Sequence, residues 1–470
     1  MNKPFCEWGG QMAWPNLKRL PAHGFCRILA LRLFMLTVFF VASNHVLSVE
    51  PSGPNVILIM ADDLGYQDLG CYGHPAIRTP HLDQLAAQGV RMTDFHSGAT
   101  VCTPSRMALL TGYYPYRLGW RRGVIGHLME PATGLDPNIQ TMGEIFASAG
   151  YATGLIGKWH LGDEAPFRPH RQGFGENHYL NKSNNQTKQV WQGDQVVEEP
   201  FDNRLLTERW FERAEAFVTR HADKKFFLYL PLTAPHFPVE PHPGFDGRSA
   251  FGAYGDVVEE VDERFGQLML LLKRLDLSEH TLVWFLSDNG PQPGEAARSY
   301  PYRGLKWDAL EGGTRVPSIV SWPGRLPHGR ICRGMTGALD IMPTLLEACG
   351  LNLPAPIEGL PPLDGQSQWA MIQDPALHGG RESLLYWHGR EGFQAIRMGR
   401  WKLFPVGNHA GLEAGGPDGQ KPALFDLEQD PGERINLAAE YPQRVEHMLQ
   451  ASQAKLADIQ AHRIPLGQAP

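Results

Sequence analysis

NVILIMADDLG, residues 55–65, is the stretch that decides the fold. Its first six residues form a continuous apolar run of the length of a β-strand. Runs of this kind are typical of strands covered on both faces in a parallel sheet. The run ends in Asp62 and Asp63. We therefore expect a central strand that delivers two carboxylates at its carboxyl end.

Three further apolar runs also end in polar side chains. They are residues 152–156 before Lys158 and His160, residues 226–232 before His236, and residues 281–286 before Asp288 and Asn289. Helical patterns lie between them, for example over residues 256–275, where apolar side chains recur at spacings of three and four. Alternating strands and helices predict an α/β fold with an open parallel sheet.

The polar side chains after these strands are expected to meet in one crevice, because ligands bind outside the carboxyl ends of parallel strands. Carboxylate and amide oxygens without clustered cysteines favour a hard cation, calcium first and magnesium as the alternative. The two histidines are not spaced as close metal-ligand pairs. They suit proton transfer or contact with an oxyanion better.

A single cysteine stands in the segment VCTPSRMALLTG, residues 101–112. Thr103 is expected to cap the following helix, Pro104 to take its first position and Arg106 to lie on its first turn. Cys102 would then face the positive end of the helix, which stabilises an anionic nucleophile. An exported thiol is open to oxidation, however, and no dedicated general base is evident for it. The sequence thus points to a chemically altered Cys102.

An ordered set of motifs resembles the type I sulfatases across about residues 53–350. The motifs are Cys102-Thr103-Pro104-Ser105-Arg106 with Leu110-Thr111-Gly112, Asn55-Val56 through Asp62-Asp63-Leu64-Gly65, Gly157-Lys158-Trp159-His160-Leu161-Gly162, Ala234-Pro235-His236, Ser287-Asp288-Asn289-Gly290, Gly304-Leu305-Lys306 and Glu311-Gly312-Gly313-Thr314-Arg315. The resemblance implies an alkaline-phosphatase-like sandwich. Its large mixed, mostly parallel sheet would be flanked by helices and followed by a small C-terminal α+β subdomain with an antiparallel sheet.

The resemblance also implies a site. A maturation enzyme would oxidise Cys102 to formylglycine, whose hydrate supplies the nucleophilic oxygen for hydrolysis of a sulfate ester. The implied metal ligands for calcium are Asp62, Asp63, Asp288, Asn289 and the modified residue 102. Asp288 would in addition take a proton from the hydrate. The implied catalytic side chains are Arg106 and Lys158, which steady the modified residue, His160, which accepts a proton during sulfate release, and His236 with Lys306, which hold the sulfate and assist the leaving alcohol.

The pattern changes after about residue 375, so we place a catalytic domain at residues 49–375 and a C-terminal subdomain at residues 376–470. Residues 393–403 alternate like one antiparallel strand, residues 424–427 resemble another, and residues 442–462 form a helical pattern. Residues 407–421 are a glycine-rich loop, interpreted as a surface hairpin or as a border of the substrate pocket.

Residues 1–48 are interpreted as a secretory signal peptide, with basic residues before an apolar run at residues 33–42. We expect an exported protein, periplasmic or secreted, with an uncleaved membrane anchor as the alternative. Without these residues 38 basic and 49 acidic side chains remain, a balance that disfavours nucleic acid as a partner. The four cysteines left are too few for a disulfide scaffold, and a bridge between Cys332 and Cys349 stays open.

Two other functions remain open. One is a phosphatase, phosphodiesterase or phosphonate hydrolase of the same superfamily, and the other is a catalytically silent protein that binds sulfated glycans. The expected substrate is a sulfated sugar or polysaccharide, held by loops at residues 167–195 and 291–302. Plausible sugar contacts in these loops are His178, Asn181, Asn184, Trp191 and Arg298.

Overall fold

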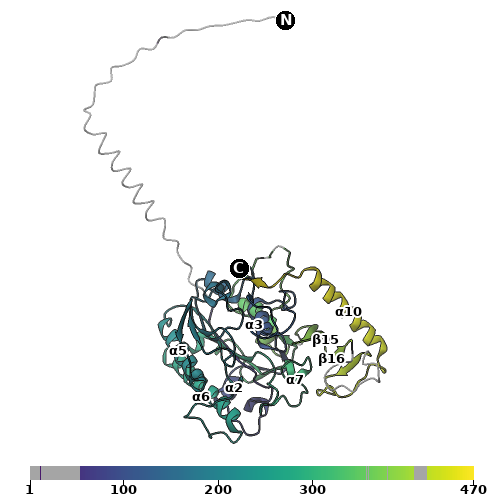
Figure 1. Ribbon diagram of the computed structural model, residues 1–470, viewed down its shortest axis with the longest axis horizontal. Coiled ribbons are helices and arrows are strands. Elements are labelled where there is room, and N and C mark those ends of the chain that lie inside the picture. The colour runs from purple at the N-terminus through teal and green to yellow at the C-terminus, as the bar shows by residue number, and fades with distance from the viewer. Residues whose placement is uncertain are drawn as a thin grey trace, which may run out of the picture. The chain divides into compact units, whose positions relative to one another are not determined.

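The computed structural model describes Gln11 and residues 53–469, apart from residues 356, 358, 378 and 407–420. The predicted signal peptide and the glycine-rich loop thus fall outside the described residues, except for Gln11 and Lys421. Residues 50–470 form one compact unit, drawn as ribbons in Figure 1.

The main element of this unit is a ten-stranded sheet in the order β12-β2-β11-β10-β1-β9-β5-β6-β7-β8. Its strands are β1 Asn55–Ala61, β2 Val90–Met92, β5 Ala152–Lys158, β6 Glu176–Leu180, β7 Val190–Gln192, β8 Gln195–Glu198, β9 Phe226–Pro231, β10 Thr281–Ser287, β11 Ser318–Ser321 and β12 Arg330–Cys332. The five neighbours from β10 to β6 run parallel. On one side β11 pairs antiparallel with β10, and on the other β7 pairs antiparallel with β6 and β8 antiparallel with β7. The four predicted strands are therefore adjacent, and the mixed, mostly parallel sheet is confirmed.

Helices cover both faces of the sheet. They are α2 Pro80–Ala87, α3 Cys102–Thr111, α4 Met142–Ser148, α5 Leu206–Arg220, α6 Gly252–Arg274, α7 Glu311–Thr314, α8 Ile341–Ala348 and α9 Trp369–Gln373. A further helix, α10 Pro442–Ala461, packs on the second sheet described below. Short 3-10 helices span Gly70–Tyr72, Ala165–Phe167, Pro169–Gln172, Asn203–Leu205, Ser278–His280 and Ala338–Asp340.

Strand β1 divides the apolar core in two, because successive side chains of a strand point to opposite faces. Ile57 and Ile59 pack in one cluster with side chains of α2, α5 and α6. Val56, Leu58 and Met60 pack in the other with α3, α4 and α8. In Figure 1, α2, α5 and α6 accordingly lie on the side of the sheet away from α3. The apolar run of β1 is buried throughout, as a strand between two helical layers requires.

A second sheet lies in the C-terminal part of the unit. It is antiparallel, in the order β14-β15-β16-β17, with bounds Ser383–His388, Gly392–Met398, Trp401–Phe404 and Ala423–Asp426. The single strand predicted over residues 393–403 is wrong in detail: Gly399 has a φ of 57° and turns the chain, so β15 and β16 form a hairpin. Helix α10 packs on this sheet, as Figure 1 shows.

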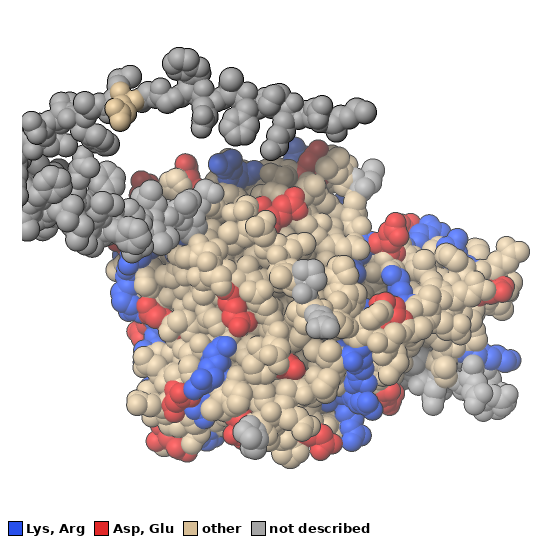
Figure 2. Space-filling view, turned by 90° about the horizontal axis from the view of Figure 1, so that it is seen from above, with Lys and Arg blue, Asp and Glu red and all other residues tan. Residues whose placement is uncertain are grey.

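Two short ladders complete the fold. Strand β13 Thr336–Gly337 pairs with β3 Phe95–His96, and β18 Gly467–Gln468 pairs with β4 Thr133–Gly134. Within the described residues no helix is long and apolar enough to span a bilayer. Cys71, Cys102, Cys332 and Cys349 are all free, so Cys332 and Cys349 do not pair. On the face seen in Figure 2, charged side chains form small separate groups among uncharged ones.

Candidate active site

The adjacent strands β1 and β10 deliver four polar side chains to one place. The parallel register pairs Ala61 with Ser287, so the residues after each strand leave the sheet side by side. The backbone N–H of Asp63 donates a hydrogen bond to Asp288 Oδ1 at 3.1 Å. Asp62, Asp63, Asp288 and Asn289 are all buried. Sheet topology thus joins two segments that are more than two hundred residues apart.

Asp63 is held from two sides. Its backbone is left-handed, with a φ of 68°, which turns the chain sharply after β1. Asn289 Nδ2 donates to Asp63 Oδ1 at 2.6 Å, and Lys306 Nζ donates to Asp63 Oδ2 at 2.8 Å. Carboxylates near Lys306, Asp63 first, raise its pKa although burial acts in the opposite direction. Lys306 therefore stays charged in the site.

Two further cations come from β5 and α3. Lys158, the last residue of β5, donates through Nζ to Asp62 Oδ2 at 2.6 Å. Arg106 donates to Asp288 Oδ2 from Nε at 3.2 Å and from Nη2 at 2.7 Å, and its Nη1 donates to the carbonyl of Lys158 at 2.9 Å. Both cations are completely buried. They fix the two carboxylates that face each other across the strand ends.

Cys102 lies in the same cluster. One ligand atom each of Asp62, Asp63, Cys102 and His236 lie within 4.8 Å of one another. The thiol is buried, and burial raises its pKa to about 12 despite the nearby Lys158 and Lys306. An unmodified thiol here is therefore protonated at neutral pH and a weak nucleophile.

The start of α3 differs from the prediction. Cys102 is itself the first helical residue, Val101 is the N-cap without a side-chain bond, and Pro104 is the third residue of the helix. Thr103 does not cap the helix. Its Oγ1 donates to the carbonyl of His160 at 2.9 Å and accepts from the N–H of Ile125 at 3.1 Å. The hydroxyl instead ties together two loops beside the site.

The two histidines are held through backbone carbonyls. His160 Nε2 lies 3.1 Å from the carbonyl of Ile125, and His236 Nδ1 lies 2.7 Å from that of Phe237. Donation to those carbonyls leaves the other ring nitrogen of each as a proton acceptor. His160 Nδ1 is buried without a hydrogen-bond partner, and His236 Nε2 lies 3.7 Å from Asp63 Oδ2.

Burial keeps both rings neutral. Burial, then the nearby Lys158, holds the pKa of His160 well below its usual range. Burial and Lys306 lower the pKa of His236 to about 4. Both imidazoles can thus accept a proton at neutral pH.

The described residues fit a bound calcium ion. Asp62 Oδ1 and Asn289 Oδ1 are buried and accept no hydrogen bond, although such oxygens are normally satisfied in a folded protein. Oxygen donors of this kind are the ligands that calcium prefers. The donor set therefore suits a hard cation.

The charges of the site favour the same conclusion. Three carboxylates face the cations Arg106, Lys158 and Lys306, so the cluster is neutral when the histidines are neutral and Asp288 is ionised. A divalent cation would leave room for two negative charges, such as a singly charged ester and an anionic nucleophile. Burial and the neighbouring Asp62 raise the pKa of Asp288 to about 7, while Lys158 keeps the pKa of Asp62 low although burial acts against it.

A second group with metal-ligand residue types lies elsewhere. It comprises Asp94, His96 and Glu311. Arg397 donates to Asp94 Oδ2 at 2.6 Å, and Lys402 donates to Glu311 Oε1 at 3.0 Å. Its carboxylates are thus paired with cations from β15 and β16, and the group joins the small sheet to the main unit rather than offering free ligands.

The expected sugar contacts divide into two sets. Asn181 and Asn184 lie beside the site, since the carbonyl of Asn181 accepts from the N–H of His160 and Asn184 Nδ2 lies 3.5 Å from the carbonyl of His236. His178 is inside β6, paired with Ile156 rather than in a loop. The segment 167–195 is therefore not one loop but contains the 3-10 helix Pro169–Gln172 and the strands β6 and β7.

The other two expected contacts are engaged elsewhere. Trp191 is in β7, where the Arg168 guanidinium lies 4.7 Å from its ring centroid. Arg298 lies over Phe251 at 4.9 Å, and its backbone N–H donates to Asp68 Oδ1. Both side chains are already stacked on a partner.

Sequence reasoning did not find the segment at residues 123–128. The carbonyl of Ile125 accepts from His160 and also from Gln186 Nε2 at 3.2 Å, and the His127 ring meets Trp307 edge-on. A backbone carbonyl carries no sequence signal, so only the fold reveals this contact.

Comparison with known proteins now decides the family. Residues 54–351 match the protein-family model described as Sulfatase, and residues 379–468 match the C-terminal region of aryl-sulfatase. The chain belongs to the sulfatase family. This confirms the resemblance read from the motifs, and it makes the protein an enzyme that hydrolyses sulfate esters.

Individual relatives support the family assignment over most of the length of this sulfatase. Human arylsulfatase A is 35% identical, with 85% of this chain and 86% of the relative covered. Human N-acetylgalactosamine-6-sulfatase is 32% identical, with 88% of each covered. The crystal structure of Ps i-CgsB in complex with k-i-k-neocarrahexaose has a TM-score of 0.74 and 26% identity, covering 88% of this sulfatase and 95% of that chain.

Proposed function

We propose that this sulfatase cleaves sulfate from a sulfated sugar, with Cys102 converted to formylglycine and a calcium ion held by Asp62, Asp63, Asp288 and Asn289. The observation that carries the proposal is a pair of buried oxygens without a hydrogen-bond partner: Asp62 Oδ1, in the cluster that contains Cys102, and Asn289 Oδ1, on a side chain bonded to Asp63. When present, the formylglycine hydrate supplies the attacking oxygen and calcium neutralises charge as one anion attacks another. Magnesium is the alternative ion.

The chain's own cations bind and orient the ester. Lys306 and His236 stand on the Asp63 side of the cluster, where Lys306 Nζ is 2.8 Å and His236 Nε2 is 3.7 Å from Asp63 Oδ2. They would hold the sulfate, and Lys306 would stabilise charge that develops on the bridging oxygen. Arg106 and Lys158, paired with Asp288 and Asp62, would fix residue 102 and exclude water from its surroundings.

Proton transfer is assigned to three groups. Asp288, whose pKa is raised to about 7, would take the proton of the attacking group. His160, neutral and with Nδ1 unpartnered, would accept a second proton during release of sulfate. His236 and Lys306 would assist the leaving alcohol. Each role follows from the protonation state that burial and charge give the group.

A sugar is the proposed alcohol because of the relatives and of two amide side chains beside the site. One relative is named for N-acetylgalactosamine 6-sulfate, and one similar structure contains an oligosaccharide. Asn181 and Asn184 lie beside His160 and His236, and amide side chains suit sugar hydroxyls. We further propose export through the signal peptide at residues 1–48, with residues 49–375 as catalytic domain and residues 376–470 as C-terminal subdomain.

The test begins with residue 102. The full chain is produced with and without a formylglycine-generating maturation enzyme, and the peptide that contains residue 102 is analysed by mass spectrometry. Active protein should carry an aldehyde at residue 102, and a Cys102→Ala variant should be inactive. Cys71→Ala is the matched control, since Cys71 is also free but outside the cluster. Fully active protein with an intact thiol would overturn the proposal.

A substrate panel separates the alternatives. Matured protein is assayed with sulfated mono- and oligosaccharides, an aryl sulfate, a steroid sulfate, and phosphate and phosphonate esters, with and without chelator. The proposal expects sulfated sugars to react best and the chelator to abolish activity. Faster turnover of the phosphate or phosphonate esters would favour the related hydrolases. Protein that keeps the thiol of Cys102 and only binds sulfated glycans would favour a silent glycan-binding function.

A further inference from the structure

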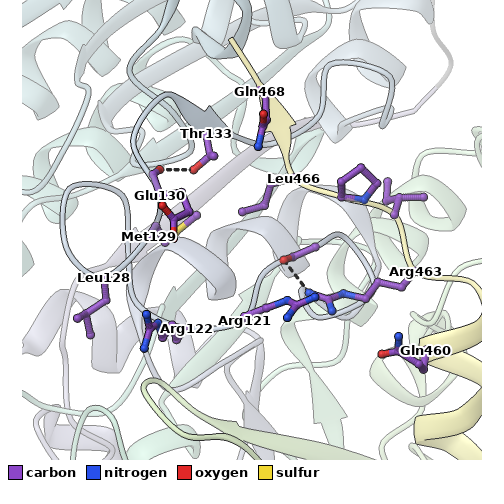
Figure 3. Close-up of a pocket in the computed structure, with 13 residues that line it drawn as sticks. Arg121, Arg122, Leu128, Met129, Glu130, Thr133, Gln460, Arg463, Leu466 and Gln468 are labelled. Atoms are coloured by element: carbon purple, nitrogen blue, oxygen red, sulfur yellow. Dashed lines mark hydrogen bonds between the residues drawn. The ribbon is translucent and has the colours of Figure 1, made fainter. Parts of the chain in front are cut away.

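A pocket outside the catalytic cluster has a basic wall. Its volume is about 690 Å³, and the residues that matter here are Gly119, Arg121, Arg122, Glu130, Arg463 and Gln468 (Figure 3). One wall comes from the segment after α3 and the other from the segment after α10. The mechanism proposed above uses none of these side chains.

Two distant parts of the chain build this pocket. Strand β18 pairs with β4, and the N–H of Ile464 donates to the carbonyl of Arg117 at 2.9 Å, so the segment around Leu466 lies against the segment around Gly119. Gly119 has a φ of 91°, and a Cβ atom there would lie 2.2 Å from the backbone nitrogen of Leu466. Only glycine permits so close an approach. The walls are therefore held by backbone contacts rather than by mobile side chains.

Arg463 is fixed in the wall. Its Nη2 donates to the carbonyl of Gly119 at 2.9 Å, and its guanidinium carbon lies 4.3 Å from the ring centroid of Tyr116. Its Nε is buried and has no hydrogen-bond partner. Burial and then the charge of Arg121 lower the pKa of Arg463. Arg463 thus has a positive neighbour and, within the described residues, no acidic side chain paired with it.

The positive charge of this wall is not compensated within the described residues. Arg121, Arg122 and Arg463 form no ion pair there. Glu130 is the one acidic side chain among the described residues that line the pocket. Figure 3 shows the Arg121 and Arg463 side chains next to each other, with Glu130 on the opposite wall beside Thr133. Two adjacent guanidinium groups repel each other, and an anion between them would relieve the repulsion.

The pocket is close to the catalytic cluster along the chain. Arg122 is followed by Gly123, whose N–H donates to the carbonyl of Gly389 at 2.7 Å, and the carbonyl of Ile125 contacts His160. Ile125 comes three positions after Arg122, and three extended residues span at most roughly 11 Å. A short sugar chain could therefore reach from one site to the other.

We propose that this pocket binds a second sulfate group of a sulfated sugar chain whose reacting sulfate lies in the catalytic cluster. The inference rests on the proposed function and adds a polyanionic oligosaccharide as the substrate class. Guanidinium groups match the planar, bidentate hydrogen-bonding pattern that oxyanions offer. The formal charge of the chain is −7, so its average field repels a polyanion. Arg121, Arg122 and Arg463 would set which end of the sugar chain faces Cys102.

The test measures how tightly the full matured chain and two of its variants bind a heparin-derived hexasaccharide, which is chosen as a sulfated probe. The test variant is Arg121→Gln/Arg122→Gln, since both side chains are exposed and their loss does not disturb the core. Arg330→Gln is the control, because Arg330 is an exposed arginine of β12 outside the pocket. We expect the double variant to bind about tenfold more weakly, as two surface charge contacts allow. The control should change affinity less than about twofold.

Further arms identify the anion and the site. Hydrolysis of a small aryl sulfate should be unchanged in the double variant, since such a substrate does not reach the pocket. A hyaluronan oligosaccharide, which carries carboxylates and no sulfate, should bind the wild-type chain more weakly than the hexasaccharide. Equal affinity of the double variant and the wild-type chain for the hexasaccharide, or no binding by either, overturns the inference. Lack of aryl sulfate hydrolysis by the matured wild-type chain would instead count against the proposed function.

Discussion

Replacing Asp62 by Asn tests the calcium site with little change in shape. The substitution removes one negative charge and keeps a group that can still face Lys158 Nζ, which lies 2.6 Å from Asp62 Oδ2. Asp62 Oδ1, the oxygen without a hydrogen-bond partner, becomes part of a neutral amide. We expect the affinity for calcium to fall by at least about 100-fold, because losing even a residue that supports a metal ligand costs about 10- to 100-fold.

The expected thermal shift follows from the size of the folded unit. Calcium at 100 times its Kd stabilises the wild-type chain by about 2.7 kcal/mol. The unit of residues 50–470 has an unfolding entropy of about 0.9 kcal/mol per degree, so its Tm should rise by about 3 °C. At the same calcium concentration the Asp62→Asn variant would be at most half saturated. Its Tm should then rise by less than about 0.5 °C.

The assay is thermal unfolding followed by tryptophan fluorescence, with calcium added to chelator-treated protein. Asp262→Asn is the control, because Asp262 is a buried carboxylate of α6 that accepts from the backbone N–H groups of His81 and Leu82 away from the cluster. The control should lose basal stability and keep the calcium shift. A normal calcium shift in Asp62→Asn would refute the assignment of Asp62 as a ligand.

Three other predictions concern the same charges. Lys306→Ala should lower kcat on an aryl sulfate by about 10²- to 10³-fold, the usual cost of removing such a donor. Lys224→Ala, on the surface, should leave kcat unchanged. An unchanged kcat in Lys306→Ala would rule out contact between Lys306 and the ester. Calcium affinity should fall as the pH drops below about 7, because protons then compete for Asp288, whose pKa of about 7 is raised by burial and by Asp62; calorimetry that finds constant affinity from pH 5 to 8 would contradict this sign. Lys402→Met should lower Tm by about 3–6 °C, since Lys402 Nζ lies 3.0 Å from both Glu311 and Glu433 and breaking a buried pair costs about 3–5 kcal/mol. Lys455→Met, at an exposed lysine, is the control. Equal Tm values for the two variants would show that Lys402 does not stabilise the fold.

The centre of the fold could be predicted because its strands are apolar throughout. Residues 55–60 and 281–286 need no tertiary context to be recognised as buried strands, and both proved to be neighbours in the sheet. Polar residues directly after such strands lie at its carboxyl edge by topology alone. The convergence of Asp62 with Asp288 is therefore readable from sequence.

Side-chain roles set by tertiary contact could not be predicted in the same way. Thr103 reads as a helix cap, but two neighbouring loops offer it the carbonyl of His160 and the N–H of Ile125. His178 reads as a loop residue because its segment lacks strong alternation, yet pairing with β5 makes it part of β6. Lys306 follows no predicted strand, and only the family resemblance drew attention to it. Local pattern fails where distant backbone supplies the partner.

The burial of Cys102 bears on the order in which this residue is modified and the protein folds. Only 1% of its surface is accessible in the folded chain, and it lies at the first turn of a helix with no exposed residue. Under the proposed function, an oxidising enzyme could not reach this segment after folding, so the newly made polypeptide would have to be processed before it folds. A batch folded without that step should stay inactive when the enzyme is supplied later, and unfolding it first should restore the opportunity.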